Sequence, residues 1–266
     1  MEYKREKKIF GKGQRVVLDA FTGDGEDSNI RFEVVDYRYS LSPWKNKRSI
    51  EFFNSGRYIY STVYLSSHRH FQPLYPQAQR AADAFFRQRE PKTALVLGCA
   101  GCSIPRFVVN HYKGCTVTGV EYSKQFVDIA QRYFISSKMR SRFKLLHDDA
   151  ISYVANAQNK EKFDYIHTDI YIGDKIHPDV FKSDFISGIY NILSDEGLAL
   201  FNAFHVPPDQ LKSIAEHISA PFRAVYVLDM YRKYFVALIK TNHKSRLSEF
   251  EKQITRSMTI EQKIIK

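Results

Sequence analysis

The most suggestive chemistry in the chain lies in residues 95–106, LVLGCAGCSIPR, where an apolar run breaks into small residues that include Cys99 and Cys102. Such a pair can be a redox centre, half of a zinc site, or two small residues in a turn against a cofactor. Zinc needs four ligands, and the one further cysteine, Cys115, is isolated. A redox centre of the thioredoxin type has aromatic and proline neighbours that are missing here, and the strand opens a much longer series of elements.

A cofactor turn fits the sequence better than either cysteine chemistry. A chain that turns sharply from a strand into a helix admits a ligand only where side chains are small. That need is met by Gly98, Cys99, Ala100, Gly101 and Ser103. In nucleotide-binding βαβ units an acid about 20 residues further on accepts hydrogen bonds from the ribose. Glu121 lies 20 residues after Gly101. Turn and acid together predict a nucleoside site.

Acidic residues also follow the next two predicted strands. Asp148 and Asp149 end one of them, and Asp169 ends the other. Ligands gather at the carboxyl ends of strands in an open parallel sheet, so these acids could contact an adenine amino group and a reacting centre. For any one of them the alternative is a helix N-cap. Tyr171 could contact a substrate, with a place at the edge of the core as the alternative. His147 and His167, beside Asp148 and Asp169, could assemble a metal site, but polar strand-end residues around a nucleoside explain them more simply, so we expect no metal.

The surrounding elements define an α/β protein. Residues 16–21, 30–40 and 56–67 have the Val, Ile, Tyr and Phe content of antiparallel strands, whereas strands and helices alternate from residue 92 onward. This alternation predicts a mainly parallel sheet covered on both faces, with an antiparallel hairpin at one edge. We therefore expect an N-terminal β-strand region at 1–75, a Rossmann-like nucleoside-binding domain at 76–242 and a basic C-terminal tail at 243–266.

Composition narrows the class of protein. The 266 residues are 44% hydrophobic and 26% charged, as in a globular protein with an ample core. No run reaches the ~18 apolar residues of a membrane span, and no signal peptide is recognisable, so we expect a cytoplasmic protein with no membrane partner. The net charge of +11 is concentrated at the two ends and comes with no nucleic-acid-binding motif, so we expect no nucleic-acid partner.

The segments ALVLGCAGCSIPR, VTGVEYS, FKLLHDDA and FDYIHTDIY resemble the spermidine synthase family of aminopropyltransferases, over about residues 55 to 240. That family is a branch of the class I S-adenosylmethionine-dependent methyltransferase fold. The resemblance implies this fold after a small N-terminal β domain, with S-adenosylmethionine or decarboxylated S-adenosylmethionine as co-substrate and no metal. It also implies roles for individual residues: Gly98 and Gly101 in the glycine turn, Glu121 on the ribose, Asp149 with Asp148 before it on adenine, and Asp169 as the catalytic acid of the T-D-x-x-D-P stretch.

The sequence departs from the family at the loop and at the amine site. The family's G-G-G-D-G-G loop, whose Asp contacts the amino group of the cofactor side chain, is GCAGCS here. The later Asp-Pro is absent, and the Tyr-x-Glu segment is replaced by LYPQAQR, which places Gln77 or Gln79 where the family has a carboxylate. Two hypotheses stay open: a transferase that moves an aminopropyl or methyl group to a polyamine or another amine, and a non-catalytic protein that binds an adenosyl ligand. Assembly as a homodimer is also open.

Overall fold

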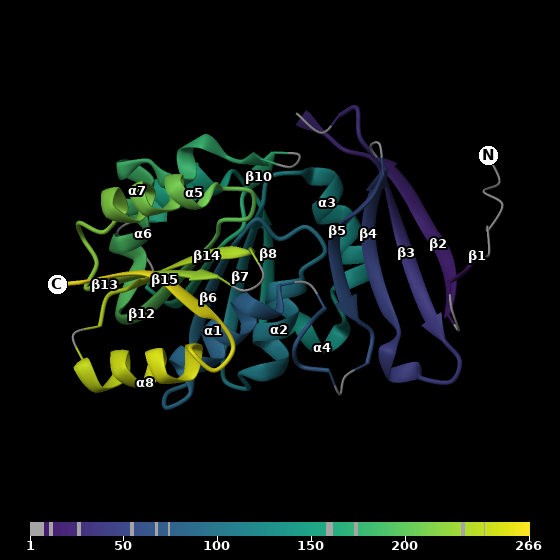
Figure 1. The fold of residues 1–266 in the computed structure, drawn as a ribbon. Helices are drawn as coiled ribbons and strands as arrows, with labels where there is room; N and C mark the ends of the chain where they lie inside the picture. The colour runs from purple at the N-terminus through teal and green to yellow at the C-terminus, as the bar shows by residue number, and fades with distance from the viewer. Residues whose placement is uncertain are drawn as a thin grey trace.

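The computed structural model describes residues 8–10, 13–25, 28–53, 56–66, 69–73, 75–157, 162–172, 175–229, 232–241 and 243–266. In this part of the chain a five-stranded sheet near the N-terminus lies beside an eight-stranded sheet that is flanked by helices (Figure 1). A small two-stranded ribbon consists of β10 (Tyr171–Ile172) and β11 (Lys175–Ile176).

The N-terminal sheet is antiparallel, and its strand order follows the chain. Its strands are β1 (Lys8–Phe10), β2 (Gly13–Thr22), β3 (Arg31–Tyr39), β4 (Lys47–Phe53) and β5 (Arg57–Tyr64). Alternation along β3 places Phe32 and Val34 on one face, where both are buried against Phe126 and Phe134 of the following domain. The sequence did not predict β1 or β4, because β4 begins with charged residues that weaken its apolar alternation.

The large sheet has the strand order β15-β13-β14-β12-β9-β6-β7-β8. Its strands are β6 (Thr93–Leu97), β7 (Thr116–Glu121), β8 (Phe143–His147), β9 (Phe163–Thr168), β12 (Leu193–Asn202), β13 (Ala224–Asp229), β14 (Tyr234–Ile239) and β15 (Thr259–Ile265). Strands β12, β9, β6, β7 and β8 are parallel, and β13 and β14 form the predicted antiparallel hairpin. The predicted α/β class is confirmed, and the carboxyl ends of the parallel strands meet at one edge.

Helices cover both faces of this sheet (Figure 1). One face carries α1 (Pro76–Phe86), α2 (Ser103–His111) and α8 (Lys244–Ile254), and the other carries α5 (Ala150–Ala157), α6 (Ser183–Ile192) and α7 (Pro208–Ile218). The remaining helical segments are η2 (Pro43–Lys45), α3 (Lys124–Ile129), the π-helical η3 (Ala130–Phe134), α4 (Ser137–Arg140) and η4 (Pro178–Phe181). No described helix has the length and apolar composition that a membrane crossing requires.

The C-terminal segment is not the tail that its charge suggested. Leu247, Phe250 and Ile254 form an apolar stripe on α8 and are buried, with the ring of Phe250 5.8 Å from that of Phe85 on α1. After this helix β15 pairs with β13 and extends the sheet beyond the predicted edge hairpin. The high charge of residues 243–266 belongs to the exposed sides of a folded helix and strand, so the prediction of a tail was wrong.

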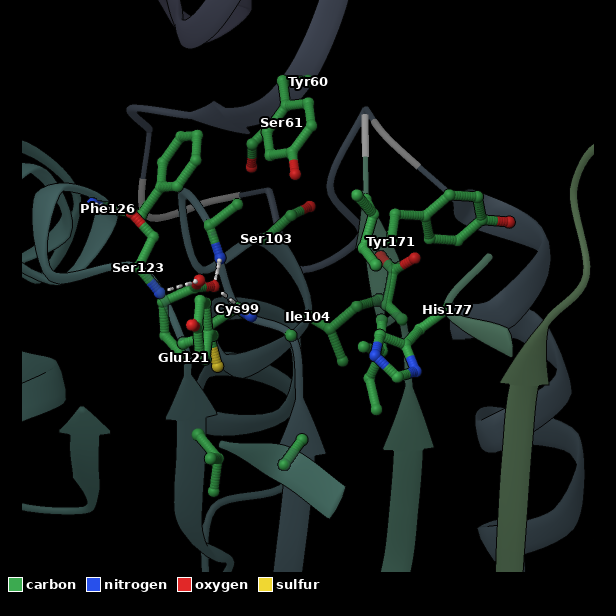
Figure 2. Close-up of a pocket in the computed structure, with 18 of the residues that line it drawn as sticks. Tyr60, Ser61, Cys99, Ser103, Ile104, Glu121, Ser123, Phe126, Tyr171 and His177 are labelled. Atoms are coloured by element: carbon green, nitrogen blue, oxygen red, sulfur yellow. Dashed lines mark hydrogen bonds between the residues drawn. The ribbon is translucent and has the colours of Figure 1, made fainter. Parts of the chain in front are cut away.

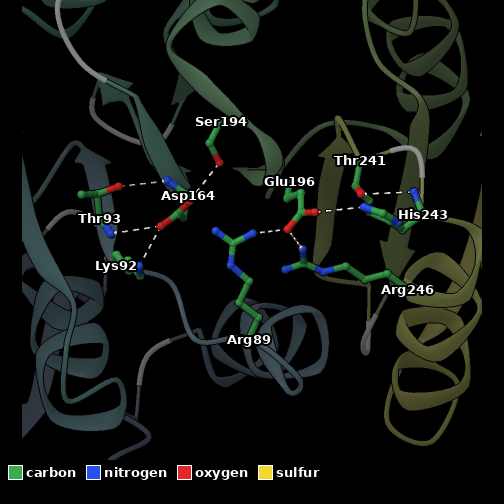
Figure 3. Close-up of polar contacts among 9 residues, drawn as sticks. All are labelled: Arg89, Lys92, Thr93, Asp164, Ser194, Glu196, Thr241, His243 and Arg246. Atoms are coloured by element: carbon green, nitrogen blue, oxygen red, sulfur yellow. Dashed lines mark hydrogen bonds and ion pairs between the residues drawn. The ribbon is translucent and has the colours of Figure 1, made fainter.

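Ion pairs fix α8 to the opposite end of the sheet from the strand carboxyl termini. Glu196 of β12 accepts hydrogen bonds from Arg89, which follows α1, and from Arg246 of α8 at 3.2 Å (Figure 3). His243 Nε2 lies 3.0 Å from the other carboxylate oxygen of Glu196. The guanidinium of Arg246 also lies 4.3 Å from the ring centre of Phe85. The segment is therefore held by polar and apolar contacts together.

Candidate active site

A cavity of about 600 Å³ opens at the carboxyl ends of the parallel strands (Figure 2). Its walls come from the β6–α2 loop, the end of β7, the segment after β9, and strands β4 and β5 of the N-terminal sheet. Glu121 and Ser123 lie on one side in Figure 2, Tyr171 and His177 lie on the other, and Ser103 lies between them. The cavity therefore needs both sheets to be complete.

The β6–α2 loop is the turn that the small residues predicted. Gly98 has a φ of +82°, and a Cβ added to it would lie 2.1 Å from the carbonyl oxygen of Asp169. Glycine is required on both counts. Ala100 and Cys102 also have positive φ values, of 41° and 56°, which bend the chain directly into α2. The loop thus holds two strand ends close together, those of β6 and β9.

The cysteines are packing residues in this loop. Cys99 and Cys102 are buried, and burial raises the pKa of both thiols, so neither is the accessible thiolate that redox chemistry needs. The sulfur of Cys99 lies where a side chain at Gly119 of β7 would project, 2.7 Å from the position of its Cβ. Small residues on both sides let the loop lie against β7. These contacts support the cofactor-turn interpretation over the redox alternative.

Glu121, at the end of β7, lines the cavity and holds the loop in place. Its Oε2 accepts hydrogen bonds from the amides of Cys99 at 2.9 Å and Ala100 at 2.8 Å, and its Oε1 accepts one from Ser123 at 3.0 Å. Burial raises the pKa of this carboxyl, and the three amides oppose that effect. Oε2 already accepts two hydrogen bonds, so the lone pair that is still available belongs to Oε1. Contact with a ribose, in addition to the loop, stays a prediction.

The two acids after β8 take different positions. Asp149 lines the cavity, and its Oδ1 caps α5 by accepting a hydrogen bond from the amide of Ser152 at 2.7 Å. Asp148 is exposed, is not among the residues lining this cavity, and borders a shallow neighbouring hollow with His147 and Lys124. The capping alternative therefore applies to Asp149, and its contact with adenine stays a prediction.

Asp169 lines the same cavity as Glu121, at the end of the neighbouring strand but one, and is partly buried. Its Oδ1 accepts a hydrogen bond from Asn202 Nδ2 at 2.7 Å, and burial raises its pKa to about 7. Asn202 is oriented by the amide of Phe204, which donates to its Oδ1 at 3.0 Å. The hydroxyl of Tyr171 donates to the carbonyl of Phe204 at 3.0 Å. A carboxyl with a pKa near neutrality, held by an amide, is suited to accept a proton.

Gln77 does not reach the cavity. It is buried on α1, and its Oε1 has no hydrogen-bond partner among the described residues, whereas Tyr75 at the start of α1 does line the cavity. Gly101 is not a lining residue either, because Ser61 of β5 lies against it: a Cβ at Gly101 would be 2.7 Å from Ser61 Oγ. Sequence reasoning placed both residues in the site and missed Tyr75 and Ser61.

Other lining residues were also missed, for identifiable reasons. Asn202 contacts Asp169 from the end of β12, so the strand-end rule could have found it. Tyr60 of β5 stacks on Phe126 with ring centres 5.1 Å apart, and no local pattern indicates that contact.

Two histidines, His177 and His205, line the cavity, whereas His167 is not among its lining residues. His167 is buried on β9, with Nδ1 3.2 Å from the hydroxyl of Tyr165, and burial lowers its pKa to about 3, so its ring is neutral. Within the described ranges, no three His, Cys, Asp or Glu side chains are grouped as a metal site requires.

The geometry agrees with a match to a family model. Residues 82–246 match the spermine/spermidine synthase domain. The chain is 26% identical over 138 residues to a polyamine aminopropyltransferase of Vibrio vulnificus, and 23% identical over 157 residues to an eEF1A lysine and N-terminal methyltransferase of Danio rerio. These alignments cover 52% and 56% of this chain but only 44% and 23% of the two relatives. The chain therefore spans less than half the length of the curated relatives that it matches.

Solved structures show the same fold. A probable spermidine synthase from Corynebacterium glutamicum has a TM-score of 0.66 at 16% identity, and covers 91% of this chain and 90% of its own. Human methyltransferase-like protein 13, in complex with SAH, has a TM-score of 0.56 at 21% identity, with 68% of this chain and 90% of its own covered. Because the family model matches more than half of the residues, the chain belongs to the spermine/spermidine synthase family and has the class I methyltransferase fold.

Proposed function

We propose that the chain is a transferase that binds S-adenosylmethionine, or its decarboxylated form, and moves a methyl or aminopropyl group onto an amine. The observation that carries this proposal is that Glu121 and Asp169 line one cavity on either side of the β6–α2 loop, each held by hydrogen bonds. The names of the relatives, an aminopropyltransferase and a methyltransferase, support both group transfers.

The residues present fit an adenosyl ligand. Gly98 lets the loop pack against the backbone of Asp169, which brings both strand ends to the cavity, and Glu121 Oε1 keeps one acceptor position for a ribose hydroxyl. Tyr60 and Phe126 form an aromatic wall beside Glu121 that suits a purine ring. When bound, the sulfonium supplies activated carbons next to sulfur, so the chain's own residues need only to align the amine and to remove a proton.

Asp169 is the residue that takes this proton. An amine must be uncharged to attack, and a carboxylate beside it both attracts the ammonium form and accepts its proton. The pKa of about 7 leaves about half of the Asp169 side chains ionised at neutral pH. Asn202 donates to Asp169 Oδ1, which directs the second oxygen to the acceptor. Tyr75, Tyr171 and Phe204 give the acceptor end an aromatic lining.

The experiment offers the purified chain each sulfonium form with putrescine, spermidine or a peptide that carries a free amino terminus and a lysine. Mass spectrometry of the products identifies both the acceptor and the group transferred. We expect S-adenosylhomocysteine or methylthioadenosine to accumulate with wild-type protein and not with Asp169→Asn. If the adenosyl ligands bind but no amine is modified, the non-catalytic binding protein is the better description and the transferase proposal is wrong.

A further inference from the structure

One wall of the cavity contains a buried hydroxyl without a partner. Ser103, the first residue of α2, is 5% exposed, and its Oγ has no hydrogen-bond partner among the described residues. The residue lines the cavity midway between Glu121 and Tyr171 (Figure 2). A buried polar group left unpaired costs about 1–3 kcal/mol, so its presence at a cavity wall indicates a ligand group that completes it.

The same wall is the N-terminus of a helix of 9 residues. Cys102 precedes it in the left-handed conformation and provides no side-chain cap. The amides of Ser103 and Ile104 open the helix, so no preceding turn supplies carbonyl groups for them. Amides at a helix start carry partial positive charge and favour an anionic group.

No acidic side chain belongs to this wall. The described carboxylates that line the cavity are Asp24, Glu121, Asp149 and Asp169, and all come from other elements than α2 and β5. Opposite Ser103, β5 contributes Ser61, which lies so close to Gly101 that a side chain there would collide with it. An ammonium alone at this wall would have only hydrogen-bond donors and hydroxyls around it. A carboxylate would find a hydroxyl and helix amides.

We propose that the first turn of α2 with Ser103 is a carboxylate subsite, and that the chain takes the carboxylated sulfonium, S-adenosylmethionine, in preference to the decarboxylated form. This inference rests on the proposed function and selects methyl transfer within it. A bond forms between the amine nitrogen and the methyl carbon while the bond from that carbon to sulfur breaks. The electron pair stays on sulfur, which becomes a neutral thioether, and the amine proton goes to Asp169.

The test is calorimetry with three stable ligands that share the adenosyl group. S-adenosylhomocysteine has a carboxylate and an ammonium, S-adenosyl-3-thiopropylamine has the ammonium alone, and methylthioadenosine has neither. We expect S-adenosylhomocysteine to bind at least tenfold more tightly than S-adenosyl-3-thiopropylamine. The propylamine should bind no more tightly than methylthioadenosine. Comparison of the first two isolates the carboxylate, and it needs no variant.

A variant then assigns the effect to the wall. Ser103→Ala is expected to weaken binding of S-adenosylhomocysteine by about ten- to a hundredfold, the size of one hydrogen bond to a charged group, and to leave binding of methylthioadenosine unchanged. Ser141→Ala, at an exposed residue beyond α4, is the matched control and should change neither. Tighter binding of the propylamine, or an equal effect of Ser103→Ala on both ligands, would overturn the inference. If none of the three binds, the proposed function itself is wrong.

Discussion

Asp169→Asn should lower turnover and, above neutral pH, make the protein more stable. Burial raises the pKa of Asp169 from 3.8 to about 7. The folded chain therefore holds a proton that the unfolded chain has already lost between these two pH values. The contribution to stability is complete below pH 3.8 and is lost as pH rises through about 7. At ~1.4 kcal/mol for each tenfold change in acidity, this difference has an upper limit of about 4 kcal/mol.

Water in the cavity screens part of that cost, so we expect about 1–3 kcal/mol. Asparagine has no charge at any pH, and its Oδ1 can still accept the hydrogen bond from Asn202. Urea denaturation at pH 4 should give similar free energies of unfolding for the wild type and the variant. At pH 8 the variant should be more stable by about 1–3 kcal/mol. Because every other titrating group is common to both proteins, the change in their difference reports Asp169 and its electrostatic coupling to Glu121.

The pH dependence of turnover should report the ionisation of the same carboxyl group. The wild-type rate should rise about tenfold for each pH unit below 7 and level off above it, since only the ionised carboxylate accepts a proton. Asp169→Asn should lose about 10²–10⁴ in kcat and lack this step. Asp195→Asn is the matched control, because that carboxylate is 95% exposed. A variant that is less stable than the wild type at pH 8, or that keeps the pH step, would refute the reasoning.

Three further substitutions test the loop and the C-terminal segment. Glu121→Gln should weaken methylthioadenosine by about 10–100-fold in calorimetry, because it removes the charge and one acceptor from a carboxylate that holds three amides; unchanged affinity would exclude a ligand role. Gly98→Ala should cost roughly 3 kcal/mol or more in denaturation, while Gly114→Ala, with nothing within 4 Å of its Cβ position, should cost under about 1 kcal/mol; equal effects would contradict the steric argument. Glu196→Gln should lower the free energy of unfolding by about 1 kcal/mol and speed amide exchange in α8, and both effects should be smaller at high salt. Unchanged amide exchange would show that apolar packing alone holds the helix.

Strand-end residues could be predicted from the sequence because the topology places them. Once strands and helices alternate, the ends of β6, β7 and β9 must meet at one edge, and this brings Gly98, Glu121 and Asp169 to one cavity. Gln77 was placed by the correspondence of LYPQAQR with the family's Tyr-x-Glu segment. The direction of its side chain depends on the phase of α1, which buries it outside the lining of the cavity. Asn202 obeys the strand-end rule and was overlooked because an amide was not considered.

Contacts between distant segments could not be read from local patterns. Tyr60 and Ser61 reach the cavity only because the N-terminal sheet packs on Phe126, and neither residue belongs to a recognisable motif. The C-terminal segment was misjudged for a similar reason. The charges of this segment can be read from its own sequence, whereas Phe250 packs against residues far away in the chain, Phe85 of α1 and Tyr226 of β13.

The close contact between Ser61 and Gly101 constrains the order in which substitutions at these two positions can be accepted. A side chain at residue 101 would lie 2.7 Å from Ser61 Oγ, 2.9 Å from Ser61 Cβ and 3.0 Å from the ring of Phe134. Rotating the serine moves its oxygen but not its Cβ, so an aspartate at 101 is not reachable by one neutral step. Ser61→Gly, made first, would open the space but would weaken β5. The effects of substitutions at residues 61 and 101 therefore depend on each other. Laboratory evolution towards an acidic loop should select substitutions at both positions together or at neither.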